Sequence, residues 1–386
     1  MARGIIILGS TGSIGQQALE VVRANADDLA VVGLAAGQNL DLLRRQVQEY
    51  HPANVSAPRL TPGTVWNGAR VVSLTEICQT QEGERVLIST VGTTGLLPTL
   101  AAIRARKTVM LANKEVLVMA GDLVMAEARR VGIPVLPVDS EHNAAWQCFA
   151  GDCSLSAGAI VGPLQRIILT ASGGAFRDLS PHQLLQVTPR QALAHPTWVM
   201  GPKVTVDCAT LMNKGFEVIE AHWLFGLPYE QIDVVLHRES IVHALVEFVD
   251  GSLKAELGAP DMRIPIQHAL TYPDRRASSW RHLRIEDVGQ LSFAPLERGR
   301  YPCFDLAMEA ARVGGTTTAV LSAADEVAVE RFLAGEIAFT EIPEVVDRAL
   351  QAHQSISRPT VDEVLAIDQE VRRDVDERLG RGIRRA

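Results

Sequence analysis

The stretch GIIILGSTGSIG, residues 4–15, decides the class of this fold. Its continuous apolar run, 4–8, is typical of a strand buried on both faces of a parallel sheet. The glycines that follow permit a tight turn and a close approach of the backbone to a pyrophosphate, which the free N–H groups of a new helix would bind. The spacing is GxxGxxG rather than GxGxxG and is unspecific by itself. Its place directly after the first strand predicts a dinucleotide site, with an ordinary Gly-rich turn as the alternative.

Short apolar runs and helical patterns alternate from this stretch as far as residue 138. Crossovers of this length join parallel strands, so the pattern predicts a Rossmann-like, doubly wound α/β sheet. The predicted strands are 4–8, 29–35, 86–89, 108–111 and 134–138, and the predicted helices are 16–23, 40–50, 96–106 and 123–131.

The rhythm changes after residue 138 and predicts a central α/β domain. Asp250-Gly251 lies between two apolar runs and is a strong hairpin signal, so this second sheet should be mixed. Its predicted strands are 166–170, 203–206, 234–236, 244–249 and 252–257.

The last part of the chain predicts helices without strands. Residues 258–300 are rich in charge and proline and indicate a connector. Helical patterns follow over 303–312, 318–334 and 344–353, and Thr360 with Glu363 forms a capping box ahead of a last helix. We therefore predict a dinucleotide-binding domain (1–138), a catalytic domain (139–272), a connector (273–300) and a C-terminal helical bundle (301–386).

Composition limits the function. The 386 residues, 47% hydrophobic and 21% charged, exclude global disorder and fit two or three domains. A net charge of −8 argues against a nucleic-acid partner. No apolar run is long enough for a signal peptide or membrane span, and the five cysteines contain no CxxC pair. We expect a cytoplasmic protein with no membrane partner.

The end of the second predicted strand discriminates between cofactors. An NAD-specific site usually has Asp or Glu here, whereas this chain has Gly37, Gln38 and Asn39. Without a carboxylate to repel a 2′-phosphate, NADP is the better prediction. No basic residue is present either, and an ordinary strand-end turn stays an alternative.

Polar residues follow two further predicted strands. Lys114 and Glu115 come after 108–112, where ligands bind in open α/β sheets, or they form a solvated surface pair. Asp139 and Glu141 come after 134–138 and could converge on one hard cation. The alternative for this second stretch is an acidic helix N-cap.

A later helix carries Lys214, Glu217 and Glu220 three residues apart, so that they share one face. One carboxylate could join the cation of Asp139 and Glu141, while Lys214 binds an anionic group. A solvated, salt-bridged face is the alternative, although the apolar residues 221–225 indicate that this helix packs against a core.

Residues 172–202 have the composition of a lid that closes over a ligand. The segment begins at Ser172-Gly173-Gly174 and ends with the stretch HPTWVMG, residues 195–201. Trp and Met side chains on a stretch bounded by Pro and Gly are typical of such a lid. A core-packed loop with a structural His195 is the alternative.

Taken in order, these stretches resemble one family, the 1-deoxy-D-xylulose 5-phosphate reductoisomerases of isoprenoid-precursor biosynthesis. The ordered set of motifs is specific where each motif alone is not, and the resemblance spans the chain. The matching motifs are GSTGSIG (9–15), LANKE (111–115), VDSEHNA (138–144), ASGGAF (171–176), HPTWVMG (195–201) and ATLMNKGFEVIEA (209–221).

The resemblance implies a homodimeric enzyme that uses NADPH and Mg²⁺ or Mn²⁺, with Co²⁺ as a further candidate. It would convert a small phosphorylated sugar, 1-deoxy-D-xylulose 5-phosphate, to 2-C-methyl-D-erythritol 4-phosphate. The implied metal ligands are Asp139, Glu141 and Glu217, with Glu220 beside them, and the implied catalytic residues are Glu141, Lys114 and His195. The implied substrate contacts are Ser140, Glu141, Ser172, His195, Trp198, Cys208, Asn213, Lys214 and Glu217. The implied NADPH contacts are Thr11, Gly12, Ser13, Ile14, Gly37, Gln38, Asn39, Asn113, Glu115 and Gly201.

Two positions depart from the family pattern. Cys208 stands where the family commonly has Ser, and a thiol is a weaker hydrogen-bond donor than a hydroxyl. Gln38 stands where many members carry a basic residue. Two other classes remain as alternatives: an NADP oxidoreductase of the homoserine or aspartate-semialdehyde dehydrogenase kind, and a dinucleotide-sensing regulator.

Overall fold

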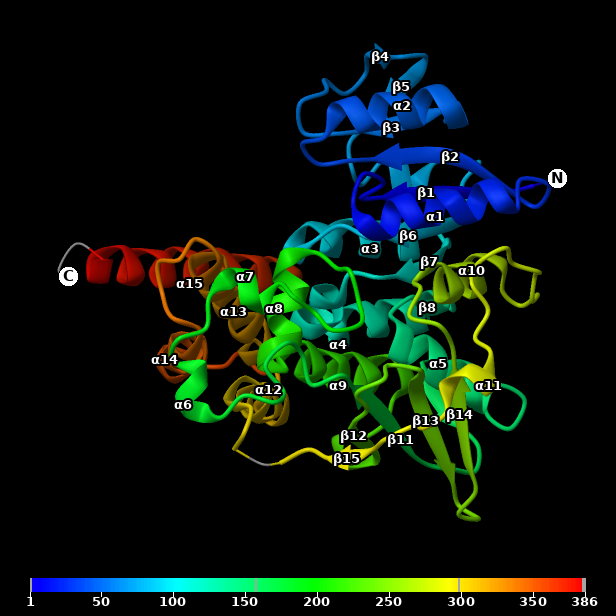
Figure 1. The fold of residues 1–386 in the computed structure, drawn as a ribbon. Coiled ribbons are helices and arrows are strands. Elements are labelled where there is room, and N and C mark those ends of the chain that lie inside the picture. The colour runs from blue at the N-terminus through cyan, green and yellow to red at the C-terminus, as the bar shows by residue number, and fades with distance from the viewer. Residues whose placement is uncertain (1, 157, 298, 384–386) are drawn as a thin grey trace.

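The computed structural model describes residues 2–156, 158–297 and 299–383. Its N-terminal part is a sheet in the order β4-β5-β3-β2-β1-β6-β7-β8, in which every neighbouring pair is parallel except β4 and β5 (Figure 1). The predicted doubly wound sheet is therefore confirmed. Its strands are β1 (Arg3–Leu8), β2 (Leu29–Ala35), β3 (Asn54–Ser56), β4 (Val65–Trp66), β5 (Ala69–Val71), β6 (Arg85–Ile88), β7 (Thr108–Leu111) and β8 (Val135–Pro137).

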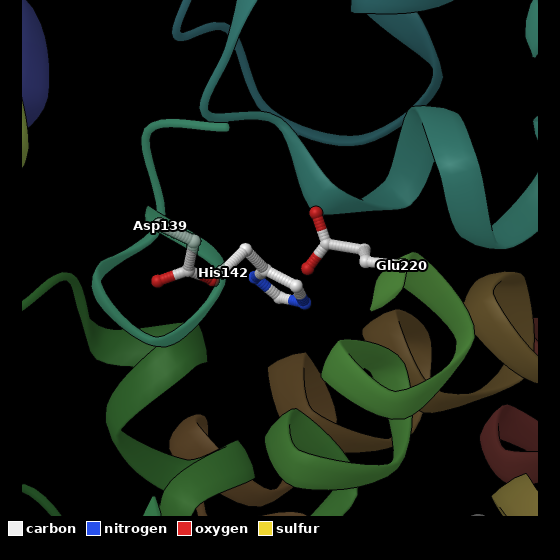
Figure 2. A group of neighbouring side chains, drawn as sticks. All are labelled: Asp139, His142 and Glu220. Carbon is white, nitrogen blue, oxygen red and sulfur yellow. The ribbon is translucent and has the colours of Figure 1, made fainter. Parts of the chain in front are cut away.

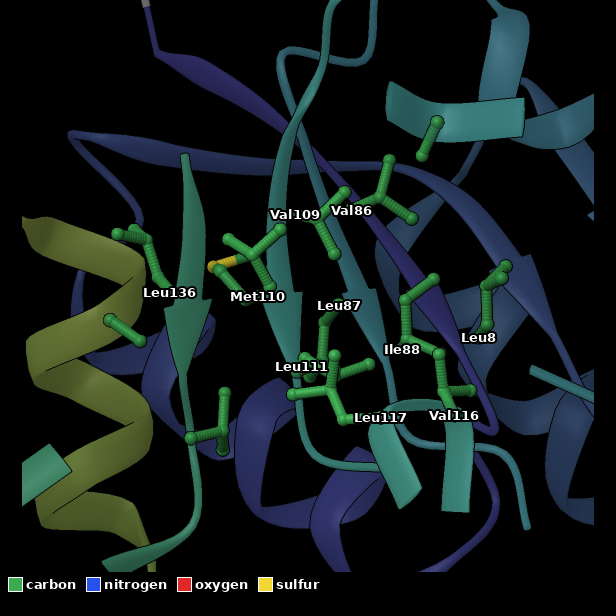
Figure 3. Packing of buried hydrophobic residues seen from close by; sticks show 14 of the residues in the cluster. Leu8, Val86, Leu87, Ile88, Val109, Met110, Leu111, Val116, Leu117 and Leu136 are labelled. Carbon is green, nitrogen blue, oxygen red and sulfur yellow. The ribbon is translucent and has the colours of Figure 1, made fainter. Parts of the chain in front are cut away.

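Continuous apolar strands form this sheet because helices cover both of its faces. Leu87 on β6 and Met110 on β7 are fully buried, and Figure 3 shows the aliphatic side chains of neighbouring strands packed together. The helices of this part are α1 (Ser13–Ala24), α2 (Leu40–Tyr50), α3 (Leu96–Arg104) and α4 (Lys114–Val131), with 3₁₀ turns η1 (Ile77–Gln79) and η2 (Gly92–Gly95).

The central sheet is mixed, as predicted, and has the order β14-β13-β11-β12-β15. β11 and β12 are parallel, while β13 pairs antiparallel with both β11 and β14. Asp250 and Gly251 form the predicted hairpin turn, in which Gly251 N–H donates to the Phe248 carbonyl at 2.9 Å. The strands are β11 (Leu164–Ala171), β12 (Ile232–Leu236), β13 (Val242–Phe248), β14 (Leu253–Leu257) and β15 (Ala294–Pro295).

Two helices join the sheets. α5 (Ser140–Phe149) packs on β13 and β14, and α9 (Met212–Phe225) packs on α4 and β12. Further short elements lie between α5 and β12 in the chain. They are the hairpin β9 (Ser154–Ser156) and β10 (Ala159–Val161), α6 (Pro181–Leu184), α7 (Pro189–Ala192), α8 (Pro202–Thr210) and η3 (Tyr229–Gln231).

One sequence prediction in this region is wrong. Residues 203–206 form no strand but lie in α8, because Gly201 and Pro202 start a helix whose Val206 is buried against α9 and α13. The expected connector over 258–300 contains α10 (Arg263–Thr271) and α11 (Ile285–Val288). Polar residues between its apolar positions hid α10, which packs on α1.

The C-terminal part is helical, and none of its described residues after 301 forms a strand. Its elements are α12 (Pro302–Val313), α13 (Thr317–Leu333), η4 (Phe339–Glu341), α14 (Ile342–Ala352) and α15 (Val361–Ile383). The capping box is confirmed, since Thr360 N–H donates to Glu363 Oε2 at 2.7 Å. α13 is buried on nearly all sides and also contacts α4 and α8, so the bundle packs directly on the other two parts (Figure 1). The domain boundaries stay predictions.

None of the helices in the described residues is both long and apolar enough to cross a membrane.

A substitution at Gly9 tests whether the turn after β1 requires a glycine. Gly9 has φ +87°, and an added Cβ would lie 2.3 Å from the Ser89 carbonyl oxygen. We expect Gly9→Ala to destabilise the fold by about 1–3 kcal/mol through backbone strain, with the clash against Ser89 in addition. The matched control is Gly37→Ala, where nothing lies within 4 Å of the new Cβ. Urea denaturation should show a lower midpoint for Gly9→Ala alone; equal midpoints would contradict the strain.

Candidate active site

A cavity of about 680 Å³ lies at the carboxyl ends of the parallel strands. Gly12 and Ser13 follow β1, Ser89 and Thr90 follow β6, and Lys114 follows β7 at its rim. Ligands bind at this edge of open α/β sheets because the strands end there and the helices start there. The central sheet, the segment 195–204 and α13 close the other sides.

The cavity brings most of the predicted site residues together. Those that line it are Gly12, Ser13, Ile14, Lys114, Glu115, Asp139, Ser140, Glu141, Ser172, His195, Trp198, Gly201, Cys208, Asn213, Lys214 and Glu217. Those that do not line it are Thr11, Gly37, Gln38, Asn39 and Asn113.

Two of the residues outside the lining, Asn39 and Asn113, cap helices. Asn39 Oδ1 accepts a hydrogen bond from Leu42 N–H at 3.1 Å and caps α2. This contact fits the alternative given above, an ordinary turn at the end of the second strand. Asn113 is buried, caps α4 through Val116 N–H at 3.2 Å, and donates to the Gly92 carbonyl at 3.0 Å. Gly37 and Gln38 are exposed at the end of β2, beside the Gly-rich turn, so this end of the site is open to solvent.

Three carboxylates converge in the cavity. Oxygen atoms of Asp139, Glu141 and Glu217 lie within 4.8 Å of one another. Asp139 follows β8 and also accepts from Ser140 N–H at 3.0 Å, so the N-cap alternative and the cluster hold at the same time. Oxygen ligands of this kind suit a hard divalent cation such as Mg²⁺ or Mn²⁺.

Two buried lysines balance the carboxylates. Lys114 Nζ lies 2.8 Å from Asp139 Oδ2 and 2.5 Å from Asn213 Oδ1. Lys214 Nζ lies 2.8 Å from Glu141 Oε1 and also donates to Glu217. The alternatives of a solvated surface pair at Lys114 and a solvated helix face at Lys214 and Glu217 are ruled out, because all three side chains are buried.

The pKa values follow from burial and these ion pairs. Burial and the nearby Glu141 raise the pKa of Glu217 to about 8, although both lysines oppose the rise. Burial would also raise the pKa of Asp139, but the nearby Lys114, His142 and Lys214 together lower the value. Lys214 has the same effect on Glu141. The cavity therefore holds a group, Glu217, whose ionised form a bound cation would stabilise.

Asp139 also belongs to a second group of potential ligands, with His142 and Glu220 (Figure 2). His142 Nε2 is 2.7 Å from the Glu217 carbonyl, which can only accept, so this nitrogen carries the proton. Burial lowers the pKa of His142 and raises that of Glu220. Neither side chain lines the cavity, and His142 contacts the Glu217 backbone from the protein side.

Ser172 and His195 form a polar pair on the opposite wall. His195 Nδ1 accepts from the N–H groups of Thr197 at 3.2 Å and Trp198 at 3.0 Å. The proton is therefore on Nε2, which donates to Ser172 Oγ at 3.0 Å. Burial, with the charge of Arg177, lowers the pKa of His195 to about 4. Cys208 lines the same cavity, and burial raises the pKa of its thiol.

Sequence reasoning missed several cavity residues. His237, His243, Met262, Glu326 and Leu333 line the cavity but belong to no local motif. They come from the second sheet, from the residue before α10, and from α13, where no chemistry was expected. Only the packing of these elements around the cavity reveals them.

A doubly wound sheet with a Gly-rich turn and a buried carboxylate cluster in one cavity defines a class: metal-dependent, dinucleotide-binding oxidoreductases. Three family models match the chain in succession. They describe 1-deoxy-D-xylulose 5-phosphate reductoisomerase over residues 5–121, its C-terminal domain over 135–225, and the DXP reductoisomerase C-terminal domain over 257–374.

Curated relatives give the particular family. The 1-deoxy-D-xylulose 5-phosphate reductoisomerase of Shouchella clausii is 48% identical, over 96% of this chain and 99% of the relative. That of Bacillus cereus is 47% identical, over 98% of this chain and 100% of the relative. The chain therefore belongs to the 1-deoxy-D-xylulose 5-phosphate reductoisomerase family.

Solved structures agree with this assignment. A crystal structure of DOX-P reductoisomerase in complex with NADPH, fosmidomycin and magnesium superposes with a TM-score of 0.88 at 36% identity, over 98% of each chain. The Zymomonas mobilis enzyme in complex with NADPH gives 0.87 at 36% identity, over 98% of this chain and 99% of the other. Membership of this family decides against the semialdehyde or homoserine dehydrogenase and the regulator.

The His195 ring should be neutral over the whole physiological range. Its pKa in the folded state lies below the ordinary 6.5, so the unfolded chain binds more protons between these values and stability falls as the pH drops from about 6.5 to 4. Ring-nitrogen NMR should show the Nε2–H tautomer down to about pH 5, with His195→Gln to assign the signal. Titration near pH 6.5 would contradict the buried, neutral pair.

Proposed function

We propose that this chain is an NADPH- and divalent-metal-dependent enzyme that rearranges and reduces 1-deoxy-D-xylulose 5-phosphate to 2-C-methyl-D-erythritol 4-phosphate. One observation carries this proposal. The cavity that the Gly-rich turn lines also contains three carboxylates paired with two lysines: Asp139, Glu141 and Glu217 with Lys114 and Lys214. Membership of the family supports it.

Asp139, Glu141 and Glu217 fit a divalent cation by donor type and by spacing. The turn at Gly12 and Ser13 fits the pyrophosphate of NADPH, because it opens the N-terminus of α1 at the cavity rim. The relatives whose structures hold NADPH and magnesium support both assignments. When bound, the metal would supply Lewis-acid polarisation of the substrate oxygens, and NADPH the hydride.

The protein's own residues would bind and orient the substrate. Ser172, Asn213 and Lys214, with Cys208, form the side of the cavity that we assign to the phosphate. Lys214 supplies the buried cation for that dianion, while the proton on His195 Nε2 faces Ser172 Oγ. Lys114, whose pKa is raised by Asp139 and Glu217 against the opposing effect of burial, stays charged and holds Asp139 in place.

The segment 172–202 would act as a lid. Trp198 lies over the cavity with its ring centre 5.9 Å from that of His243, and Val199 beside it is almost fully exposed. An exposed aliphatic side chain at the mouth of the cavity gains burial when the segment closes on a ligand. Closure would exclude water from the rearranging substrate.

We also propose a homodimer that works in the cytoplasm. β14 is an edge strand whose Leu253 is exposed, and Val249 at its hairpin is exposed as well. An open strand edge of this kind is a natural surface for a second copy of the chain. All five cysteines are free, which suits a reducing compartment.

Glu217→Gln tests the metal site. The amide keeps the shape of the side chain but removes the charge that a divalent cation needs, so we expect turnover to fall at least about 100-fold. NADPH affinity, measured by fluorescence titration, should stay within about twofold, because Glu217 is assigned to the metal and not to the NADPH contacts. Glu344→Gln, on the exposed side of α14, is the control. Near-normal turnover of Glu217→Gln would remove this residue from the ligand set.

Cys208→Ser tests the phosphate site. A hydroxyl donates a stronger hydrogen bond than a thiol of about the same size, so substrate KM should stay equal or fall while kcat is kept. Steady-state kinetics at saturating NADPH measure both constants. A large rise in KM would show that Cys208 contributes packing rather than a phosphate contact.

A further inference from the structure

Lys203, in the first turn of α8, lies between two buried carboxylates. Its Nζ is 2.5 Å from Asp207 Oδ2 on the same helix and 2.9 Å from Asp325 Oδ2 on α13. Both aspartates have 0% exposure. The same ammonium is 3.9 Å from Glu115 Oε1 on α4 and 4.7 Å from the ring centre of Phe216 on α9. Four helices therefore meet at one positive charge.

The position of this charge in the chain connects it to the proposed site. Lys203 directly follows Gly201 and Pro202, where the predicted lid ends, and it lines the cavity. Glu115, which we assign to the NADPH side of the cavity, adjoins Lys114. Asp325 belongs to the C-terminal bundle, which supplies no residue to the reaction proposed above. None of Lys203, Asp207 and Asp325 takes part in the reaction proposed above.

The buried cluster around Lys203 contains more acidic than basic groups. Two aspartates and one ammonium leave an excess negative charge, and burial raises the pKa of both Asp207 and Asp325. Lys203 is the ammonium that faces both carboxyl groups, at 2.5 Å and 2.9 Å. The other titratable groups that face the cluster are Glu115, Glu326 and the Cys303 thiol. Such a cluster fixes its ammonium firmly, because moving it would leave buried charges unpaired.

We propose that Lys203 is a positioning residue: held by Asp207 and Asp325, it orients Glu115 and fixes the end of the lid, and so couples the C-terminal bundle to NADPH binding. The inference rests on the function proposed above for this cavity. It gives α13 a task beyond packing, since Asp325 anchors the ammonium from the bundle side.

Three variants distinguish a positioning role of Lys203 from a role in charge balance alone. Lys203→Met removes the ammonium at similar length and leaves two buried acids unpaired, so the melting temperature should fall. Asp325→Asn keeps an oxygen for Lys203 and leaves one buried acid, Asp207, to face the ammonium, so stability and NADPH binding should both be kept. The double variant Lys203→Met/Asp325→Asn removes both the ammonium and one acid, so its melting temperature should recover.

The deciding readout is the Kd for NADPH in the absence of substrate, measured by fluorescence titration of the full-length chain. We expect Kd to rise about tenfold in the double variant although its melting temperature recovers, with a parallel rise in KM for NADPH and a nearly unchanged kcat. If Kd returns to the wild-type value together with stability, Lys203 only balances charge and the proposal is wrong. A wild-type chain that binds no NADPH would instead contradict the proposed function.

Discussion

The structure of the site depends on two ammonium groups buried among carboxylates. Lys114 and Lys214 are almost inaccessible to water, and each would be costly to bury without a partner of opposite charge. Their partners come from different elements: Asp139 follows β8, Glu141 lies in α5 and Glu217 in α9. The ends of α4, α5 and α9 must therefore meet at one place. A cation bound to the three carboxylates would compete with the lysines for the same oxygens.

The two sheets bring these groups together for topological reasons. Parallel strands end at one edge, so the residues after β1, β6, β7 and β8 face the same space although they are far apart in sequence. The central sheet and the segment around Trp198 close this space from the other side. The bundle completes it, because α13 packs on both α4 and α8 and contributes Glu326 and Leu333 to the wall.

Much of the fold followed from local sequence, because buried parallel strands are continuous apolar runs and the Gly-rich turn has a fixed place after the first of them. The strand expected over 203–206 was wrong because its β-branched residues serve a helix that starts at Pro202. The convergence of Asp139, Glu141 and Glu217 matches the metal ligands that the family resemblance implied, but their roles stay predictions. His237 and His243 could not be predicted, since only the tertiary packing of the second sheet brings them to the cavity. Lys203 was hidden for the same reason: its partner Asp325 is distant in sequence.

The most direct test of this account is the oxidation of NADPH by the full-length chain with 1-deoxy-D-xylulose 5-phosphate, followed by absorbance with Mg²⁺ and with excess EDTA. The account predicts oxidation that requires both the sugar phosphate and the metal, with 2-C-methyl-D-erythritol 4-phosphate as the product. An undiminished rate in excess EDTA, or no oxidation in the presence of Mg²⁺, would contradict it.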